Sequence, residues 1–179
     1  MQDEQRRGAT PAPPTTATTS PTDAAPGTSQ GKGAAGGDAA GARHIIIVGY
    51  GLSGRSCAGA IEGREGISMS IIETNAETVA RCSKTGLHII LGDARNPEIL
   101  RRAGIDRASD VAVTVPSDQI TLAVVEQARK LNATVKIIAR CTFVSGGMEA
   151  TRRGADDVVI AEQVVATEFG RVMAAVLEP

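Results

Sequence analysis

The sequence predicts an α/β fold: a doubly wound parallel sheet of six strands, in the order 3-2-1-4-5-6, with helices on both faces. Three observations indicate it. Runs of β-forming residues alternate with helical segments from residue 44 onward. A glycine-rich segment, His44–Gly54, joins the first strand to the first helix, and the acidic Glu73 ends the second strand. Alternating strands and helices pair in parallel through right-handed crossovers.

Each strand is expected where a short apolar run ends in Gly, Pro or a polar residue. The strands span residues 44–49, 67–73, 87–91, 110–115, 134–140 and 157–160. The helices between and after them span residues 52–63, 74–84, 97–104, 119–131, 143–153 and 162–177.

Helix boundaries are predicted from capping residues. Thr74 and Glu77 have the spacing of a capping box, which opens the second helix. Further start signals are Asn96 before Pro97, and Ser117 with Asp118; further stop signals are Gly86, Gly104 and Gly154.

The glycine-rich segment is a candidate phosphate-binding loop. Gly49 permits a tight turn out of the strand, Gly51 lets a pyrophosphate approach the main chain, and Gly54 lets the helix pack close to the sheet. The helix that opens near Leu52 presents free N–H groups and its positive dipole end to an anion. The loop residues assigned to this site are Gly49, Tyr50, Gly51, Leu52, Ser53 and Gly54. The alternative is that the glycines only form a turn.

Glu73 is the candidate partner of a ribose. It lies about twenty residues beyond the glycines, where an acid accepts hydrogen bonds from the ribose hydroxyls of a dinucleotide. A carboxylate there repels a 2′-phosphate, which disfavours NADP. Asp93 and Ala94 follow the third strand, where an adenine edge would rest; the alternative is a turn in which Asp93 binds its own backbone.

Four further residues are candidates. Arg55 lies in the first turn of the glycine-loop helix, which cations normally avoid, so an anion would explain it. Val115 and Pro116 end the fourth strand and would wall the crevice. Arg140 ends the fifth strand and needs a partner, either a phosphate or a carboxylate at a subunit interface.

Composition excludes several classes of function. The chain has 179 residues, a net charge of −1 and three aromatic residues, which argues against nucleic-acid binding. Cys57, Cys82 and Cys141 are odd in number and widely spaced, as expected of buried thiols in a reducing compartment. No apolar run approaches the length of a membrane span. Residues 1–42 contain no Leu, Ile, Val or aromatic residue and are expected to form a disordered arm or linker.

The sequence favours a binding module over an enzyme. Neither histidine is expected near the crevice, and no nucleophile–base pair is evident. Two alternatives remain open: the cofactor domain of an NAD-dependent oxidoreductase, and a dimerisation module with a vacant crevice.

Several segments together resemble the N-terminal lobe of RCK domains, also called the TrkA-N or KTN domain, a Rossmann-like lobe that regulates potassium channels and transporters. They are His44–Arg55, Leu91–Glu98, Leu100–Asp106, Ile137–Arg140, Arg153–Val159 and Glu168–Met173. The last is closest to the version fused to Kef-type cation:proton antiporters. The resemblance covers residues 43–179.

The resemblance implies a cytoplasmic domain, at the inner face of the cell membrane, that binds NAD(H), AMP, ADP or ATP. It implies a homodimer that passes its ligand state to a membrane-embedded cation transporter or channel, fused or separate. The glycine loop, Arg55, Glu73 and Asp93–Ala94 match the family's site, and Arg140 matches an arginine whose contacts vary. The smaller C-terminal RCK lobe has no counterpart in these residues.

Overall fold

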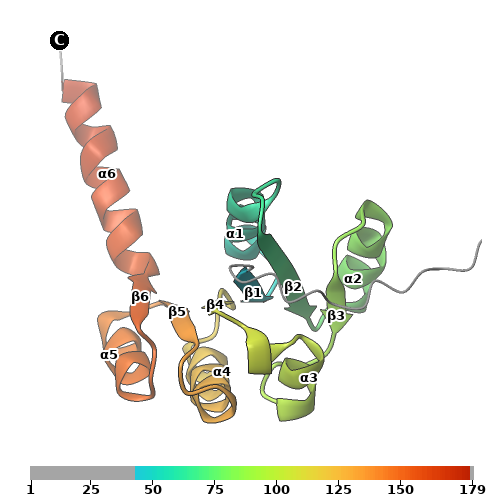
Figure 1. The fold of residues 1–179 in the computed structure, drawn as a ribbon. Helices are drawn as coiled ribbons and strands as arrows, with labels where there is room; N and C mark the ends of the chain where they lie inside the picture. The colour runs from blue at the N-terminus through green and yellow to red at the C-terminus, as the bar shows by residue number, and fades with distance from the viewer. Residues whose placement is uncertain (1–42, 178–179) are drawn as a thin grey trace, which may run out of the picture. The chain divides into compact units, whose positions relative to one another are not determined.

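The computed structural model describes residues 43–177; the predicted arm at residues 1–42 lies outside them. The described chain forms a six-stranded sheet in the order β3-β2-β1-β4-β5-β6. Every neighbouring pair of strands is parallel. The predicted fold class and strand order are therefore confirmed (Figure 1).

Helices follow each strand. The strands are β1 (Arg43–Val48), β2 (Ile67–Glu73), β3 (Ile89–Leu91), β4 (Asp110–Val113), β5 (Lys136–Cys141) and β6 (Asp157–Ile160). The helices are α1 (Leu52–Ile61), α2 (Ala76–Cys82), α3 (Pro97–Arg102), α4 (Asp118–Leu131), α5 (Val144–Arg152) and α6 (Ala161–Leu177). Short 3₁₀ turns, Ser83–Thr85 and Ile105–Arg107, follow α2 and α3.

Most predicted boundaries differ by one or two residues; β4, for example, ends at Val113 rather than 115, so Val115 and Pro116 lie in the loop after it. Two of the differences have identifiable reasons. The capping box at Thr74 does not form: Asn75 is the N-cap of α2, and its side chain accepts a hydrogen bond from the Thr78 amide at 2.9 Å. The Thr74 hydroxyl instead donates to Glu73 Oε1 at 3.3 Å. β5 begins at Lys136 rather than 134, because the side chain of Asn132 accepts the amide hydrogens of Thr134 and Val135 in a turn.

The core lies on both faces of the sheet. Alternate residues of β1 divide between them: Ile46 and Val48 belong to the larger cluster, and Ile47 belongs to the smaller one. The larger cluster includes apolar residues of α3, α4 and α5, which lie together on one side of the sheet (Figure 1). The smaller cluster joins Ile47, Ala58 of α1 and Ile71 of β2. Helix α1 is thus held by a thinner apolar layer.

Helix α6 leaves the edge of the sheet after β6, on the same side as α1, and projects away from it (Figure 1). None of its residues, 161–177, is buried. Its exposed large apolar side chains are Val164, Val165, Phe169, Val172, Met173, Val176 and Leu177. The helix therefore does not bury this surface against its own sheet.

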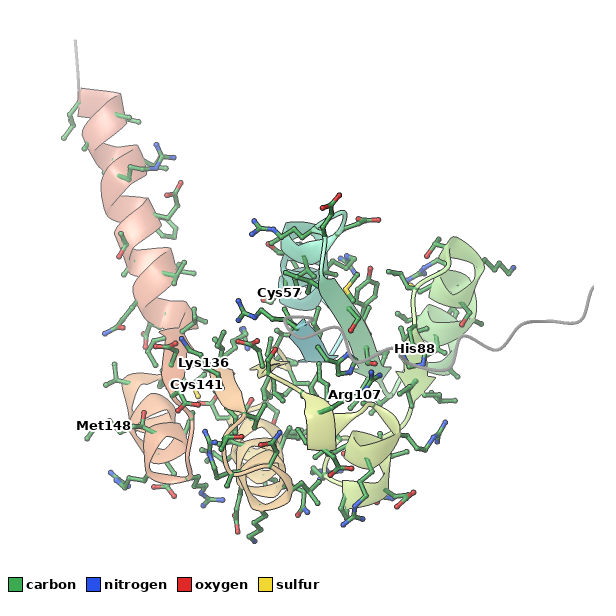
Figure 2. All side chains as sticks on the ribbon, in the orientation of Figure 1. Cys57, His88, Arg107, Lys136, Cys141 and Met148 are labelled. Carbon is green, nitrogen blue, oxygen red and sulfur yellow. The ribbon has the colours of Figure 1, made fainter. Side chains whose placement is uncertain are left out.

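His44 is buried at the amino end of β1, far along the strand from its carboxyl end. Its Nε2 donates to the Ala103 carbonyl at 2.7 Å, and its Nδ1 lies 2.9 Å from Ser68 Oγ, a hydroxyl that can donate to a neutral ring. The side chains of His88 and Arg107, labelled in Figure 2, lie near it. Burial lowers the pKa of His44 despite the Ala103 hydrogen bond, and the charge of Arg107 lowers it further. His44 is therefore a buried structural residue away from the carboxyl ends of the strands, where neither histidine was expected.

This histidine makes stability depend on pH. Because the folded-state pKa lies below the ordinary value of 6.5, the contribution is fully present above that value and declines as pH falls through the folded pKa. The slope should not exceed about 1.4 kcal/mol per pH unit for one proton. NMR titration of the His44 ring tests this, and His44→Gln should flatten the slope of the unfolding free energy near pH 6. A ring that titrates at or above 6.5 would contradict the expectation.

Candidate functional site

A crevice of about 450 Å³ lies at the carboxyl ends of the central strands. It opens where the strand order reverses between β1 and β4, which is the position at which doubly wound sheets bind ligands. Its volume falls within the range of small-molecule sites. Of the predicted site residues, seven line it: Gly49, Gly51, Glu73, Asp93, Ala94, Val115 and Pro116.

The glycine loop is shaped as the spacing predicts. Gly49 turns out of β1 with φ of +90°. At Gly54, a Cβ would lie 2.0 Å from the Gly49 carbonyl oxygen, so α1 can approach β1 only because this residue is glycine. At Gly51, the N-cap of α1, a Cβ would meet no protein atom within 4 Å. The space beside the first turn of α1 is therefore open.

Thr114 fastens this loop to β4. Its Oγ1 lies 2.9 Å from the carbonyl oxygens of both Val48 and Gly49 and shares its one hydrogen between them. Its amide also donates to Val48 O at 2.9 Å, which continues the ladder past the end of β4. Thr114 was not predicted to belong to the site; the available signal was a polar residue within the otherwise apolar run at the end of β4.

The Glu73 carboxylate is held by backbone amides. Oε2 accepts from the Tyr50 amide, within the glycine loop, at 2.7 Å, and Oε1 accepts from the Asn75 amide at 2.8 Å. Burial opposes ionisation of this carboxyl, but the hydrogen bonds from Asn75, Tyr50 and Thr74 outweigh it and lower the pKa. Glu73 is thus ionised and lines the crevice with lone pairs to spare. Its role in holding the loop was not predicted.

Asp93 is engaged by Arg95. The Arg95 guanidinium donates from Nη2 and Nε to Asp93 Oδ2, at 2.6 and 2.9 Å, and the Arg95 amide donates to Oδ1 at 2.9 Å. The hydrogen bond from the Arg95 side chain lowers the pKa of Asp93. Asp93 therefore adopts the alternative predicted for it, a turn in which its side chain accepts a hydrogen bond from nearby backbone, and it still lines the crevice beside Ala94. Arg95, a cation in the lining, was not foreseen.

The opposite wall consists of Val115, Pro116 and Ser117, with Ile120 of α4. Ser117 is the N-cap of α4, and its side chain accepts from the Ile120 amide at 3.4 Å. The predicted cap is confirmed. This wall is mainly apolar and complements the polar side formed by Glu73 and Asp93.

The remaining predicted residues do not line this crevice. The Tyr50 side chain packs against the smaller core cluster, while its amide binds Glu73. Gly54 is buried beneath the loop, and Arg55 is exposed, with Nη1 3.3 Å from the Tyr50 carbonyl oxygen. Leu52, Ser53 and Arg140 face a neighbouring groove instead.

That groove, of about 540 Å³, lies between α1, the sheet and the base of α6. Its lining is mostly apolar and includes Leu52, 80% exposed, Cys57, Ile138 and Val164. Arg140 Nη1 donates weakly to the Val115 carbonyl, 3.4 Å away, and no carboxylate within residues 43–177 forms a salt bridge with it. Cys57 is half-buried, whereas Cys82 and Cys141 are buried as predicted. Figure 2 labels Cys57 on α1 and Cys141 at the end of β5.

The doubly wound sheet, the glycine loop and the acid at the end of β2 define a dinucleotide-binding type of domain. Residues 45–161 match the model of the TrkA-N domain family, and the chain belongs to that family.

Relatives with this domain occur in cation transport proteins. The chain is 33% identical, over 135 residues, to the putative cation/proton antiporter YbaL of Escherichia coli, covering 75% of this chain and 23% of that protein. The crystal structure of the TrkA-N domain of YbaL is 31% identical with a TM-score of 0.67, covering 76% of this chain and 98% of that one.

A channel protein is also similar. The GsuK channel bound to NAD is 28% identical with a TM-score of 0.66, covering 77% of this chain and 24% of that one. GsuK has also been solved with ADP. This chain thus spans less than a quarter of the antiporter and of the intact channel. Within residues 43–177, no helix is long and apolar enough to cross a membrane.

The close approach at Gly54 can be tested with a matched pair of glycines in α1. Gly54→Ala should reduce the free energy of unfolding by about 1–3 kcal/mol, the usual cost of overpacking, because its Cβ would overlap the Gly49 carbonyl. Gly59→Ala should be neutral or gain up to about 1 kcal/mol, since a Cβ there meets nothing within 4 Å and alanine favours the helix. Urea denaturation measures both. Equal stabilities of the two variants would show that α1 has room to move.

Proposed function

We propose that this chain contains a regulatory domain of a potassium or cation transport system. It binds NAD(H) or another adenine nucleotide in the crevice between Glu73 and Pro116, and its occupancy gates transport by a membrane-embedded partner, fused or separate. The observation that carries the proposal is an ionised Glu73 lining an open crevice next to the exposed amides of the glycine loop. The proposal places the domain at the cytoplasmic face of the membrane, beside its transport partner, and the relatives' role in cation transport supports this.

The chemistry of the lining suggests how a nucleotide would be held. The ribose hydroxyls would donate to Glu73, which accepts further hydrogen bonds on both oxygens. The phosphates would lie beside Gly51, where the first turn of α1 contains no acidic residue and presents unpaired amides. Arg95 and Ala94 lie on the side where an adenine would rest, and the apolar Val115 and Pro116 would face it across the crevice.

The domain is proposed to act as a homodimer. A 17-residue helix with no buried residue is marginal in water unless its apolar side is covered. The groove at Leu52, Ile138 and Val164 is apolar and adjoins the same helix. One face of the domain therefore presents both an apolar helix and an apolar groove. In a two-fold dimer, the helix of each copy could pack into the groove of the other.

Two other readings compete with this proposal. An oxidoreductase cofactor domain would need a proton donor near the crevice. The acidic side chains in the described lining are Glu73 and Asp93. Because the pKa of each is lowered, both are ionised at neutral pH and are poor proton donors. A vacant dimerisation module would bind no nucleotide at all.

A thermal-shift panel separates the three functions. With AMP, ADP, ATP, NAD or NADH at about 100 times its Kd, a bound ligand should add about 2.7 kcal/mol of stability. A shift with no turnover of NADH and simple carbonyl substrates supports the regulatory domain. A shift with turnover supports the oxidoreductase, and no shift with any nucleotide supports the vacant module.

The Glu73–ribose contact is tested by pairing a protein variant with an altered ligand. Glu73→Gln should weaken AMP and NAD by about 1–3 kcal/mol, the scale of a hydrogen bond to a charged group. It should also narrow the discrimination against NADP, because the repulsion of the 2′-phosphate is removed. Isothermal titration calorimetry measures both.

The matched control is AMP without a ribose hydroxyl. Wild type should bind 2′-deoxy- or 3′-deoxy-AMP more weakly than AMP, and Glu73→Gln should lose much of that difference, since the two changes remove the same contact. The variant also replaces a carboxylate that holds the Tyr50 and Asn75 amides, so its unliganded stability is measured alongside. If the deoxy ligands lose as much affinity in the variant as in wild type, Glu73 does not contact the ribose.

A further inference from the structure

The wall of the crevice is connected by hydrogen bonds to the base of α6. Asp118 follows directly after Ser117 of the wall, and its Oδ1 accepts the Thr142 amide hydrogen at 2.7 Å. Thr142 Oγ1 makes a longer contact, 3.5 Å, with the carbonyl oxygen of Pro116, also in the wall. Thr142 is thus held from two sides by the β4–α4 segment.

The same residue holds the first turn of α6. The amide of Glu162 donates to the carbonyl oxygen of Thr142 at 3.2 Å. The first four amides of a helix have no partner within the helix, so an external acceptor here fixes how the helix begins. Because no residue of α6 is buried, packing does little to oppose a change in its direction.

Asp118 is closely fitted to its place. A Cβ on Gly146, in the first turn of α5, would lie 2.3 Å from Asp118 Oδ2. The carboxylate reaches the Thr142 amide because Gly146 has no side chain. Asp118 and Thr142 are both half-buried, so the hydrogen bond between the Asp118 carboxylate and the Thr142 amide is partly shielded from water.

We propose that Thr142, held by the Asp118 carboxylate, is a positioning residue. Through it, a ligand in the crevice changes how the first turn of α6 is held, and so the direction and order of that helix. A ligand that contacts Val115–Ser117 shifts the start of α4, Asp118 carries that shift to the Thr142 peptide, and the Glu162 amide follows. The inference rests on the proposed function, since it needs a ligand in the crevice. It adds the route by which that ligand would be sensed at the helix most exposed to a partner.

Hydrogen exchange of the α6 amides tests the route on the full chain. Calorimetry first establishes saturation with NAD, or with AMP if the thermal-shift panel favours it. In wild type, saturation should change the exchange rates in the first turns of α6 by about fivefold or more, the lower end of common coupling energies. Asp118→Ala should abolish most of that change at saturating ligand.

Three further variants separate coupling from stability. Asp118→Asn should keep the response, because its amide oxygen still accepts from Thr142. Gly146→Ala should lose it, because the new Cβ displaces the carboxylate while Asp118 stays in the chain. Asp156→Ala is the matched control: Asp156 Oδ2 also accepts a backbone amide at 2.7 Å, from Ile137, but at the opposite end of β5. It should destabilise the protein and keep the response.

The outcomes are distinguishable. A wild type that binds nucleotide without any change in α6 exchange overturns the inference, and so does an Asp118→Ala variant that responds like wild type. Loss of the response in Asp156→Ala as well would assign the effect to general destabilisation and also overturn it. Failure of wild type to bind any nucleotide in calorimetry would overturn the proposed function, and it is seen before exchange is measured.

Discussion

The crevice depends on the contact between the start of α1 and the end of β1. With Gly54 in place, the helix comes so near that the Gly49 carbonyl oxygen occupies the space of a Cβ. This nearness leaves the first amides of α1 beside an open space at Gly51. Two side chains then hold the loop from the neighbouring strands: Thr114 binds its carbonyl oxygens from β4, and Glu73 binds its Tyr50 amide from β2. Three strand ends therefore fix one short segment of backbone.

The polar groups around this segment are arranged before any ligand arrives. Glu73 is ionised and aligned by two amides, and Asp93 is paired with Arg95, so neither carboxylate must be reoriented to meet a nucleotide. Preorganised groups of this kind reduce the ordering cost of binding. Arg95 also offsets the negative charge that two acids would otherwise present to a phosphate-bearing ligand.

The sequence predicted the elements whose determinants are local. The turn at Gly49 and the caps at Asn96 and Ser117 follow from residue types at short spacing. The strand order follows from the alternation of strands and helices, because parallel pairing through right-handed crossovers leaves few arrangements. It did not predict the partners of long side chains, because these depend on which residues the fold brings together. Arg140 lies near the carboxyl end of β5, and Leu52 is the first residue of α1, so both were expected at the crevice. Their side chains instead face the groove beside α6. The predicted cap at Thr74 does not form for a similar reason. The Thr74 hydroxyl donates a hydrogen bond to the Glu73 carboxylate, and Asn75 is the N-cap of α2.

The exposed helix α6 has a consequence for how tightly the domain holds together. Its apolar residues contribute nothing to the core of a single chain, so any energy they supply must come from association. If α6 forms the contact of the proposed dimer, mass action would raise the melting temperature of the domain with protein concentration. A dilute sample and a concentrated one would then contain the same polypeptide with different fractions of ordered α6.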